Sequence, residues 1–193
     1  MNERQRTVGN PVPASARGLR VRLMAESDLE AVVQIQDACY TSIVPESRGS
    51  LRAKLLVSPR TCLVAETQAG VVGYAIAVPV KYPQLPALDA PRWVPPPDSD
   101  TLYLHDVAVS QEGRGNGAGA AMVAGILTAA EEAGWSRICL VAIQGSVPYW
   151  SRFGFRLAPA NDAPGKLASY GADAQLMRRA YIGASGLNCP RPH

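Results

Sequence analysis

The pattern of hydrophobic and polar positions predicts a chain in which strands and helices are mixed. Apolar residues in alternation or in short runs predict strands at 19–24, 62–66, 71–80, 101–109, 136–143 and 175–181. Apolar residues spaced by three and four predict helices at 28–40, 49–57, 117–133 and 147–153. The turn Thr67–Gly70 between two of the strands predicts an antiparallel hairpin.

The first predicted helix has a clear start signal. Ser27 is followed three residues later by Glu30, which is the Ser-x-x-Glu pattern of a capping box. Leu29, Val32 and Val33 then recur at helical spacing. We therefore expect the helix to begin at this box.

Proline and glycine mark the segments without regular structure. Seven prolines lie from 79 to 97, which excludes a helix and predicts a long, stiff connection. It is either a flap beside a substrate or a plain excursion, because long connections inside a domain are often functional. The ends lack a periodic pattern, so we expect tails at 1–18 and 182–193 around one domain at 19–181.

Composition and charge narrow the classes of function. The chain has 193 residues, of which 47% are hydrophobic and 18% charged, a composition typical of one globular domain. No signal peptide follows Met1 and no run of 18 apolar residues occurs, so we expect a soluble, cytoplasmic protein without a membrane partner. The net charge of +3 comes from dispersed basic residues, which argues against nucleic acid.

The cysteines do not indicate a metal site. They are scattered through the chain, with no Cys-x-x-Cys pair and no nearby histidine to complete a zinc set, at Cys39, Cys62, Cys139 and Cys189. This spacing argues against both a structural metal and a disulfide framework.

The most informative stretch runs from Thr101 to Val123. An apolar strand leads into glycines at 113, 115, 117 and 119, and a helix follows. A helix N-terminus carries unpaired N–H groups and partial positive charge, and glycines let the backbone approach an anion closely. Arg114 adds a fixed positive charge. The stretch therefore predicts a phosphate cradle.

Three other interpretations of the cradle are weaker. A nucleoside triphosphate loop requires a lysine after its last glycine, and no lysine lies between Lys81 and Lys166. A dinucleotide turn requires an acidic residue roughly 20 positions further on, at the end of the next strand. That strand ends at Gln144 without an acid. A flexible linker seldom lies between a strongly apolar strand and a well-formed helix.

Two motifs resemble those of the GCN5-related N-acetyltransferase (GNAT) family. The run Arg114–Gly119 resembles the family's Arg/Gln-x-x-Gly-x-Gly/Ala motif, and Tyr149–Phe155 resembles its aromatic Tyr-x-x-x-Gly-Phe pattern. The resemblance covers about 19–181 and is strongest from 101 to 155. It implies a single α/β (α+β) domain with a mixed, mostly antiparallel sheet, flanked by helices and splayed at the cofactor site.

The resemblance also implies a co-substrate, acetyl-CoA or another acyl-CoA, and no metal. The diphosphate would lie on the backbone N–H groups of Arg114, Gly115, Asn116, Gly117, Ala118 and Gly119. The pantetheine arm would pair like an extra strand with Val107, Ala108 and Val109, and Trp150 would face it. An N–H near Val107 would polarise the thioester carbonyl.

Direct attack by an amine requires a base for the ammonium proton and an acid for the leaving thiolate. His105 is a candidate base or water-positioning group, Asp106 is a second candidate, and a structural role for His105 stays open. By strand alternation the two would face opposite sides, unless a bulge exchanges them. The family's acid is often a tyrosine at the position of Trp150. Here the tyrosine is one residue earlier, at Tyr149.

The sequence does not identify the acceptor amine, which is a small molecule or a peptide. We expect its walls to come from 40–50 and from the proline-rich stretch at 81–97, with Tyr40, Glu46, Tyr82 and Trp93 as pocket-forming groups. A homodimer is compatible with the resemblance. Two other functions stay open: a non-catalytic acyl-CoA-binding or sensing module on the same fold, and a dinucleotide oxidoreductase.

Overall fold

The computed structural model describes residues 18–40, 45–159 and 161–180. Within them a seven-stranded sheet has the strand order β1-β2-β3-β4-β5-β7-β6. Its strands are β1 (Arg20–Leu23), β2 (Cys62–Thr67), β3 (Gly70–Val80), β4 (Thr101–Val109), β5 (Arg137–Ala142), β6 (Arg156–Leu157) and β7 (Gln175–Ala180). Neighbouring strands are antiparallel except β4 and β5, which are parallel.

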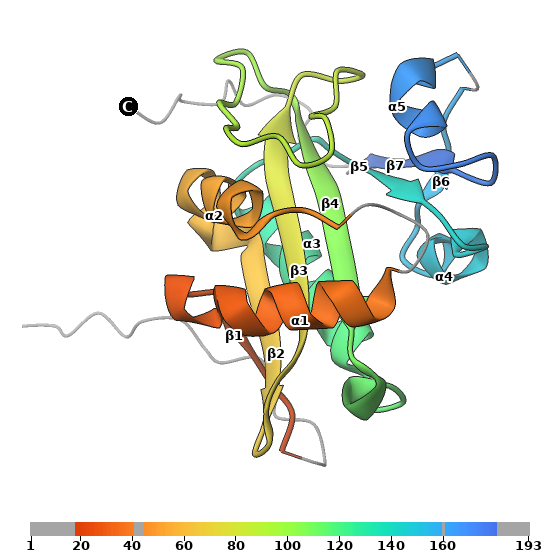
Figure 1. Cartoon of the computed structure of the whole chain (residues 1–193). Coiled ribbons are helices and arrows are strands. Elements are labelled where there is room, and N and C mark those ends of the chain that lie inside the picture. Colours follow the sequence, from red (N-terminus) through yellow and green to blue (C-terminus); the bar gives the residue numbers. More distant parts are fainter. Residues whose placement is uncertain (1–17, 41–44, 160, 181–193) are drawn as a thin grey trace, which may run out of the picture.

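Helices cover both faces of the sheet (Figure 1). In chain order they are α1 (Leu29–Cys39), α2 (Arg48–Val57), α3 (Ala118–Glu132), α4 (Val147–Ser151) and α5 (Pro164–Ala168). Helices α1 and α2 lie across one face, and α3 lies behind the other. The predicted single domain with a mostly antiparallel sheet is confirmed. Apart from Gly18, the predicted tails at 1–18 and 182–193 lie outside the described residues.

Alternation along the strands divides the core into two layers. In β3, Tyr74 and Ile76 pack in the layer under α1 and α2, whereas Ala75 and Ala77 pack in the layer under α3. This follows from the two-residue period of a strand, since successive side chains point to opposite faces. Both faces of β3 are buried, which explains its almost continuous apolar sequence.

The start of α1 differs from the sequence prediction. Ser27 does not cap the helix, and a 3₁₀ turn at Glu26–Asp28 comes before it. Asp28 instead accepts a hydrogen bond from the N–H of Ala25 at 2.8 Å, and two from Arg22 of β1 at 2.6 and 2.9 Å. The predicted capping box is therefore wrong, because a charge-assisted contact to a neighbouring strand holds this turn.

The structure also contains two elements that the sequence pattern did not reveal. They are the two-residue strand β6 and the five-residue helix α5. Both are too short to show a periodic pattern, because a helical period needs several turns to become visible. No helix among the described residues is long and apolar enough to span a membrane.

A bulge in β4 changes which side chains share a face. Ile76 pairs with Asp106 and Ala77 pairs with Leu104, so His105 is the extra residue. A bulge shifts the alternation of the strand by one position. As a result, Asp106 and Ala108 continue the face of Tyr103, and Leu104 and Val107 share the other.

Strands β4 and β5 separate after a short ladder. Their pairing is limited to Leu102–Leu104 of β4 against Ile138–Leu140 of β5. Beyond these pairs, β4 continues to Val109 and β5 to Ala142 without pairing to each other. The sheet is therefore splayed at this position, as the resemblance implied.

We predict that α2 contributes to stability chiefly through its inward face. Leu51 is fully buried, whereas Leu56 on the same helix is 54% exposed. Leu51→Ala should lower the free energy of unfolding by about 2 to 5 kcal/mol, because it leaves a cavity in the core. Leu56→Ala is the matched control and should change it by less than about 1 kcal/mol. Urea unfolding measures both, and equal effects would contradict this packing.

Candidate active site

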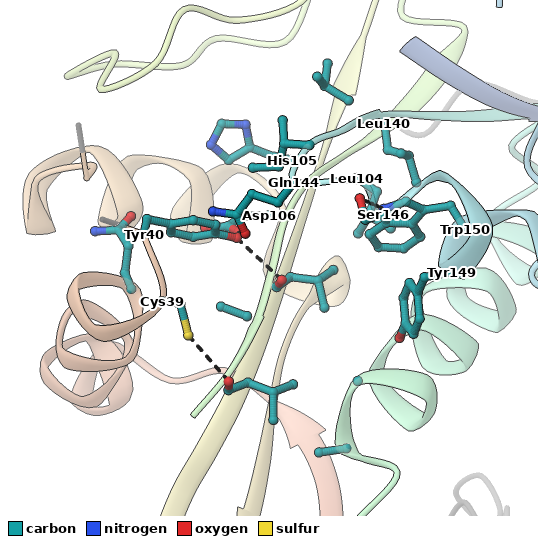
Figure 2. A pocket seen from close by; sticks show the side chains of 18 of the residues that line it. Cys39, Tyr40, Leu104, His105, Asp106, Leu140, Gln144, Ser146, Tyr149 and Trp150 are labelled. Carbon is teal, nitrogen blue, oxygen red and sulfur yellow. Dashed lines mark hydrogen bonds between the residues drawn. The ribbon is translucent and has the colours of Figure 1, made fainter. Parts of the chain in front are cut away.

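A cavity of about 520 Å³ occupies the gap between β4 and β5. One wall comes from α1 and β4, with Tyr40 and Asp106 on it, and the opposite wall comes from the end of β5 and from α4 (Figure 2). Residues of the glycine-rich turn line one end, and Glu46, His105 and Tyr170 line the cavity as well. The cavity thus connects the predicted phosphate cradle to a group of buried polar side chains.

The glycine-rich turn has the backbone of an anion site. Gly115 and Gly117 adopt positive φ angles of 74° and 80°, which side-chain-bearing residues rarely adopt. Gly117 is the N-cap of α3, and the first bond of the helix runs from the N–H of Ala121 to the carbonyl of Gly117. The N–H groups at 118–120 therefore have no partner within the helix. The exposed side chain of Arg114 lies at the same turn.

One edge of β4 faces the gap with its backbone. The N–H of Ser110 bonds to the carbonyl of Val72 in β3. In an antiparallel ladder every second residue bonds to the partner strand, so Ala108 also faces β3 while Val107 and Val109 face the gap. Their carbonyls lie within 3.5 Å of the Tyr40 hydroxyl and 3.4 Å of the Cys39 thiol, respectively.

Tyr149 and Trp150 occupy different parts of the cavity wall. A Cβ built on Gly119 would lie 3.0 Å from the Tyr149 hydroxyl, so this hydroxyl lies against the first turn of α3. The indole N–H of Trp150 donates to the Ser146 hydroxyl at 3.1 Å (Figure 2). Burial raises the pKa of Tyr149. The indole N–H of Trp150 is therefore already engaged. The Ser146 hydroxyl accepts this hydrogen bond and can still donate its own proton to another group.

Glu46 is the centre of the buried polar group. Its Oε1 accepts from the Lys54 ammonium at 2.7 Å, from the Ser50 hydroxyl at 3.3 Å and from the N–H of Asp89 at 2.9 Å. Its Oε2 lies 2.9 Å from Nε2 of His105. The three side chains of Glu46, His105 and Lys54 are 4%, 2% and 0% exposed. A single carboxylate therefore connects α2, β4 and the proline-rich stretch.

The charge of Glu46 determines that Nε2 of His105 is a hydrogen-bond donor. Burial by itself raises the pKa of Glu46, but hydrogen bonds and charge from His105 and Lys54 outweigh it and hold that pKa well below its ordinary value. An ionised carboxylate only accepts hydrogen bonds, so Nε2 of His105 carries a proton. The other ring nitrogen, Nδ1, is buried and has no hydrogen-bond partner among the described residues. In the neutral ring, Nδ1 carries the lone pair.

Asp106 is held by two tyrosines. The hydroxyls of Tyr40 and Tyr74 each donate to one of its oxygens at 2.5 Å. Burial raises the pKa of Asp106, and these hydrogen bonds oppose that shift. Because of the bulge, Asp106 lies on the same side of the sheet as His105. The bulge weighed from the sequence therefore occurs, but the two side chains share a face and do not exchange faces.

Most of the residues predicted from sequence meet in this cavity. It is lined by His105, Asp106, Val107, Ala108, Val109, Arg114, Gly115, Gly117, Ala118, Gly119, Tyr149 and Trp150, with Tyr40 and Glu46. Asn116 does not line it, and its side chain donates to the carbonyl of Glu112. Tyr82 and Trp93 do not line it either, and Leu88 is the lining residue from the proline-rich stretch. Residues 41–44 of the predicted 40–50 wall lie outside the described residues.

Several polar residues around the site were not predicted. Lys54 and Ser50 lie on the buried face of α2, and Tyr170 comes from the loop after α5. A signal for Lys54 was present, since it follows Leu51 by three positions and precedes Leu55 on an otherwise apolar face. A lysine in that place requires a buried acidic partner. Tyr170 had no such signal, because it belongs to no periodic element.

Comparison with known proteins identifies the family. The sequence model of the acetyltransferase (GNAT) family matches residues 29–155, well over half of the chain. The chain therefore belongs to the GNAT family of acyltransferases, and the resemblance seen in its motifs is confirmed. Curated protein sequences give no match. No group of three or more potential metal ligands occurs among the described residues.

Solved structures with the same fold come from distant relatives. Ard1 from Thermoplasma volcanium is 16% identical, with a TM-score of 0.64 over 86% of this chain and 99% of that one. Ribosomal-protein-S18-alanine N-acetyltransferase from Escherichia coli is 14% identical, with a TM-score of 0.59 over 89% and 99%. Phosphinothricin acetyltransferase from Sinorhizobium meliloti, in complex with acetyl-CoA, is 17% identical, with a TM-score of 0.62 over 88% and 95%.

We predict that Lys54 and Glu46 stabilise the fold mainly at neutral pH. Lys54→Met removes one partner of a buried ion pair and should cost about 3 to 5 kcal/mol at pH 7. Because the pKa of Glu46 is lowered in the folded state, its stabilisation is present above the ordinary value of 4.5 and is lost as the pH falls below it. Without Lys54 this loss should be smaller, so the difference between the two proteins should narrow below pH 4.5.

Urea unfolding between pH 7 and pH 3 measures this difference. Lys81→Met is the control, since Lys81 forms its ion pairs at the surface with Asp98 and Asp100. It should cost less than about 1 kcal/mol. A difference for Lys54→Met that stays constant across the range would contradict the coupling to Glu46.

Proposed function

We propose that this protein is an N-acetyltransferase that transfers the acetyl group of acetyl-CoA to an amine. The observation that carries the proposal is the position of the cavity: it extends from the glycine-rich turn, along the free edge of β4, to the buried carboxylate and imidazole of Glu46 and His105. Acetyl-CoA would supply an activated acyl group as a thioester. In the net reaction a nitrogen–carbon bond replaces the carbon–sulfur bond, and the ammonium gives up two protons, one of which ends on the sulfur.

The residues of the turn support a role in binding the diphosphate. Gly115 and Gly117 adopt positive φ angles, a backbone conformation that would be strained in a residue with a side chain. The N–H groups at 118–120 have no partner within the helix. A Cβ at Gly119 would reach within 3.0 Å of the Tyr149 hydroxyl, narrowing the passage between α3 and α4. We assign Arg114, Gly115, Gly117, Ala118 and Gly119 to this site, with Asn116 supporting the turn through its bond to Glu112.

The edge of β4 supports a role in holding the pantetheine arm. Val107 and Val109 present their backbone groups to the gap, whereas Ala108 faces β3. An extended amide-containing chain can pair with such an edge as an added strand. The N–H of Val107 would then stabilise negative charge on the thioester oxygen. Trp150 lies on the opposite side of the gap, where its ring would cover the bound arm.

His105 is our candidate for the base. Glu46 holds a proton on Nε2, so Nδ1 is the atom that takes up a proton from the acceptor, directly or through a water molecule. Asp106 has a tyrosine hydroxyl on each of its oxygens, which suits it better to positioning Tyr40 than to proton transfer. Glu46 acts through His105 and is a positioning residue.

Acid catalysis at the sulfur has a smaller role in this proposal. The Tyr149 hydroxyl lies at the first turn of α3, whereas Trp150 uses its N–H for Ser146. A thiol with a pKa of roughly 8.5 is a tolerable leaving group as its thiolate near neutral pH. The hydroxyls of Tyr149 and Ser146 therefore serve as hydrogen-bond donors that assist departure.

The proposal is tested by measuring thiol release from acetyl-CoA in the presence of a panel of amines. The panel should include amino acids, polyamines, aminoglycosides and short peptides, with mass spectrometry of the acetylated product. Acceptor-dependent thiol release is the expected result. Binding of acetyl-CoA without thiol release for any amine would contradict the proposal and favour a non-catalytic acyl-CoA-binding module. A nicotinamide fluorescence titration tests the oxidoreductase alternative.

We predict that the glycine-rich turn binds CoA through backbone and charge. Gly117→Val should abolish measurable CoA binding, because the residue has positive φ at the N-terminus of α3. Gly134→Val is the matched control, since Gly134 has a φ of 74° just after the other end of the same helix. It introduces similar strain and should leave CoA affinity unchanged. Arg114→Ala should weaken binding by about 1.5 to 3 kcal/mol. Calorimetry showing unchanged affinity in both Gly117→Val and Arg114→Ala would place the site elsewhere.

We predict a large loss of turnover without His105. His105→Ala should lower kcat by roughly a hundredfold to ten-thousandfold, because it removes the proton acceptor, while acetyl-CoA affinity stays nearly the same. Tyr149→Phe serves as the comparison, since it removes a hydroxyl from the other wall, and should lower kcat by about tenfold or less. Steady-state kinetics with the best amine of the panel measures both. The reverse order of the two effects would make Tyr149 the dedicated acid and leave His105 a structural role.

A further inference from the structure

A buried ammonium group lies against Tyr170, one of the side chains that line the cavity. Lys166 belongs to α5, and its Nζ is buried without a hydrogen-bond partner among the described residues. The ammonium lies over the ring of Tyr170, 4.7 Å from its centre. Tyr170 lines the cavity, and its hydroxyl lies 3.2 Å from that of Tyr103 in β4. We call the part of the cavity bounded by Glu46, His105 and Tyr170 the acceptor end.

Lys166 is not itself a lining residue of the cavity, but the charges of Glu46 and Lys54 at the acceptor end act on it. Glu46 is near enough for its negative charge to favour the protonated amine, and Lys54 opposes it. Burial is the larger influence and lowers the pKa of Lys166 to about 8, so the amine is still mostly protonated at neutral pH. Glu46 already has a full positive charge beside it in Lys54 at 2.7 Å. The Lys166 ammonium, in contrast, is buried and has no ion-pair partner in the described part of the protein.

An uncompensated ammonium in this place is costly unless a ligand uses it. A lysine side chain usually extends its charged end into water along the protein surface. In the short helix α5, Lys166 instead turns its amine onto the face of Tyr170, which supplies only a weak partner. A buried donor without an acceptor costs free energy, and an anionic ligand would remove that cost.

We propose that Lys166 binds a carboxylate of the acceptor, so that the amine substrate is a small molecule of the amino-acid class. This inference rests on the proposed acetyltransferase function and specifies its substrate. The amine would lie toward His105 and the carboxylate toward the Lys166–Tyr170 wall. A single ammonium matches the single charge of a carboxylate, whereas phosphate sites generally assemble more donors.

The dimensions of the cavity favour a small acceptor. Its volume of about 520 Å³ must contain the pantetheine arm of the co-substrate as well as the acceptor. The proline-rich stretch closes one side, since Asp89 bonds to the backbone of Ser47 at 2.8 Å and to Glu46 at 2.9 Å. Leu88 beside it supplies an apolar contact. These features suit the side chain of an amino acid better than an extended polypeptide.

Binding of reaction products tests the inference without relying on turnover. The probes are the N-acetyl derivatives of the common L-amino acids and the corresponding N-acetyl amino-acid amides, titrated into the CoA-saturated protein by calorimetry. The best acid should bind at least tenfold more tightly than its amide. Lys166→Met should reduce this preference to less than about twofold, and Lys166→Arg should retain part of it because it keeps the charge.

Controls separate a local effect from a loss of structure. Lys81→Met removes an ammonium from the surface and should leave the preference unchanged, because Lys81 pairs with Asp98 and Asp100 away from the cavity lining. CoA affinity and melting temperature of each variant show whether it is folded. Equal binding of acids and amides, no binding of either, or an undiminished preference in folded Lys166→Met would overturn the inference.

Turnover distinguishes failure of this inference from failure of the proposed function. Free amino acids and their amides should be compared as acceptors, with kcat/KM at least tenfold higher for the acid and this ratio lost in Lys166→Met. Thiol release with equal efficiency for both would overturn the carboxylate subsite and leave the acetyltransferase standing. Selective binding of the N-acetyl acids with no thiol release for any amine would uphold the subsite and contradict the reaction.

Discussion

The end of the ladder between β4 and β5 is the constraint on which the rest of the structure depends. Three residues of each strand pair, and beyond Leu104 the two strands diverge. The divergence leaves backbone groups of β4 without a strand partner and opens the cavity between the layers. Every other neighbouring pair in the described sheet is antiparallel, and the sheet opens at the single parallel pair. The glycine-rich turn lies at one end of that opening because it directly follows β4.

At the other end of the cavity, the arrangement of side chains depends on compensation of the buried negative charge of Glu46. Glu46 is almost fully buried, and it is tolerated there because Lys54, Ser50, His105 and a backbone amide all donate to it. The bulge at His105 is the backbone feature that brings the imidazole and the carboxylate of Asp106 to the same side of the sheet. A regular strand would have placed one of them toward α3. The bulge therefore connects the backbone geometry of β4 to the chemistry of the site.

Much of the fold was predictable because its signals are local. The order of the long strands and helices followed from hydrophobic periodicity, and β4 was predicted at its observed bounds, Thr101–Val109. The phosphate cradle was visible because its parts are consecutive: a strand, alternating glycines and a helix. The capping box at Ser27 failed for the opposite reason, since Asp28 bonds to Arg22 of β1, a tertiary contact that a local motif does not include.

The sequence by itself determined the longer strands and helices, the family motifs and the candidate residues His105, Asp106, Tyr149 and Trp150. Only the tertiary structure decided which of them share a wall, because that depends on a one-residue bulge and on where β5 leaves β4. Lys54 and Lys166 are alike in sequence as single lysines beside apolar residues. Packing gives the first a carboxylate partner and the second none among the described residues. A partner distant in the chain is selected by the fold and leaves no local pattern.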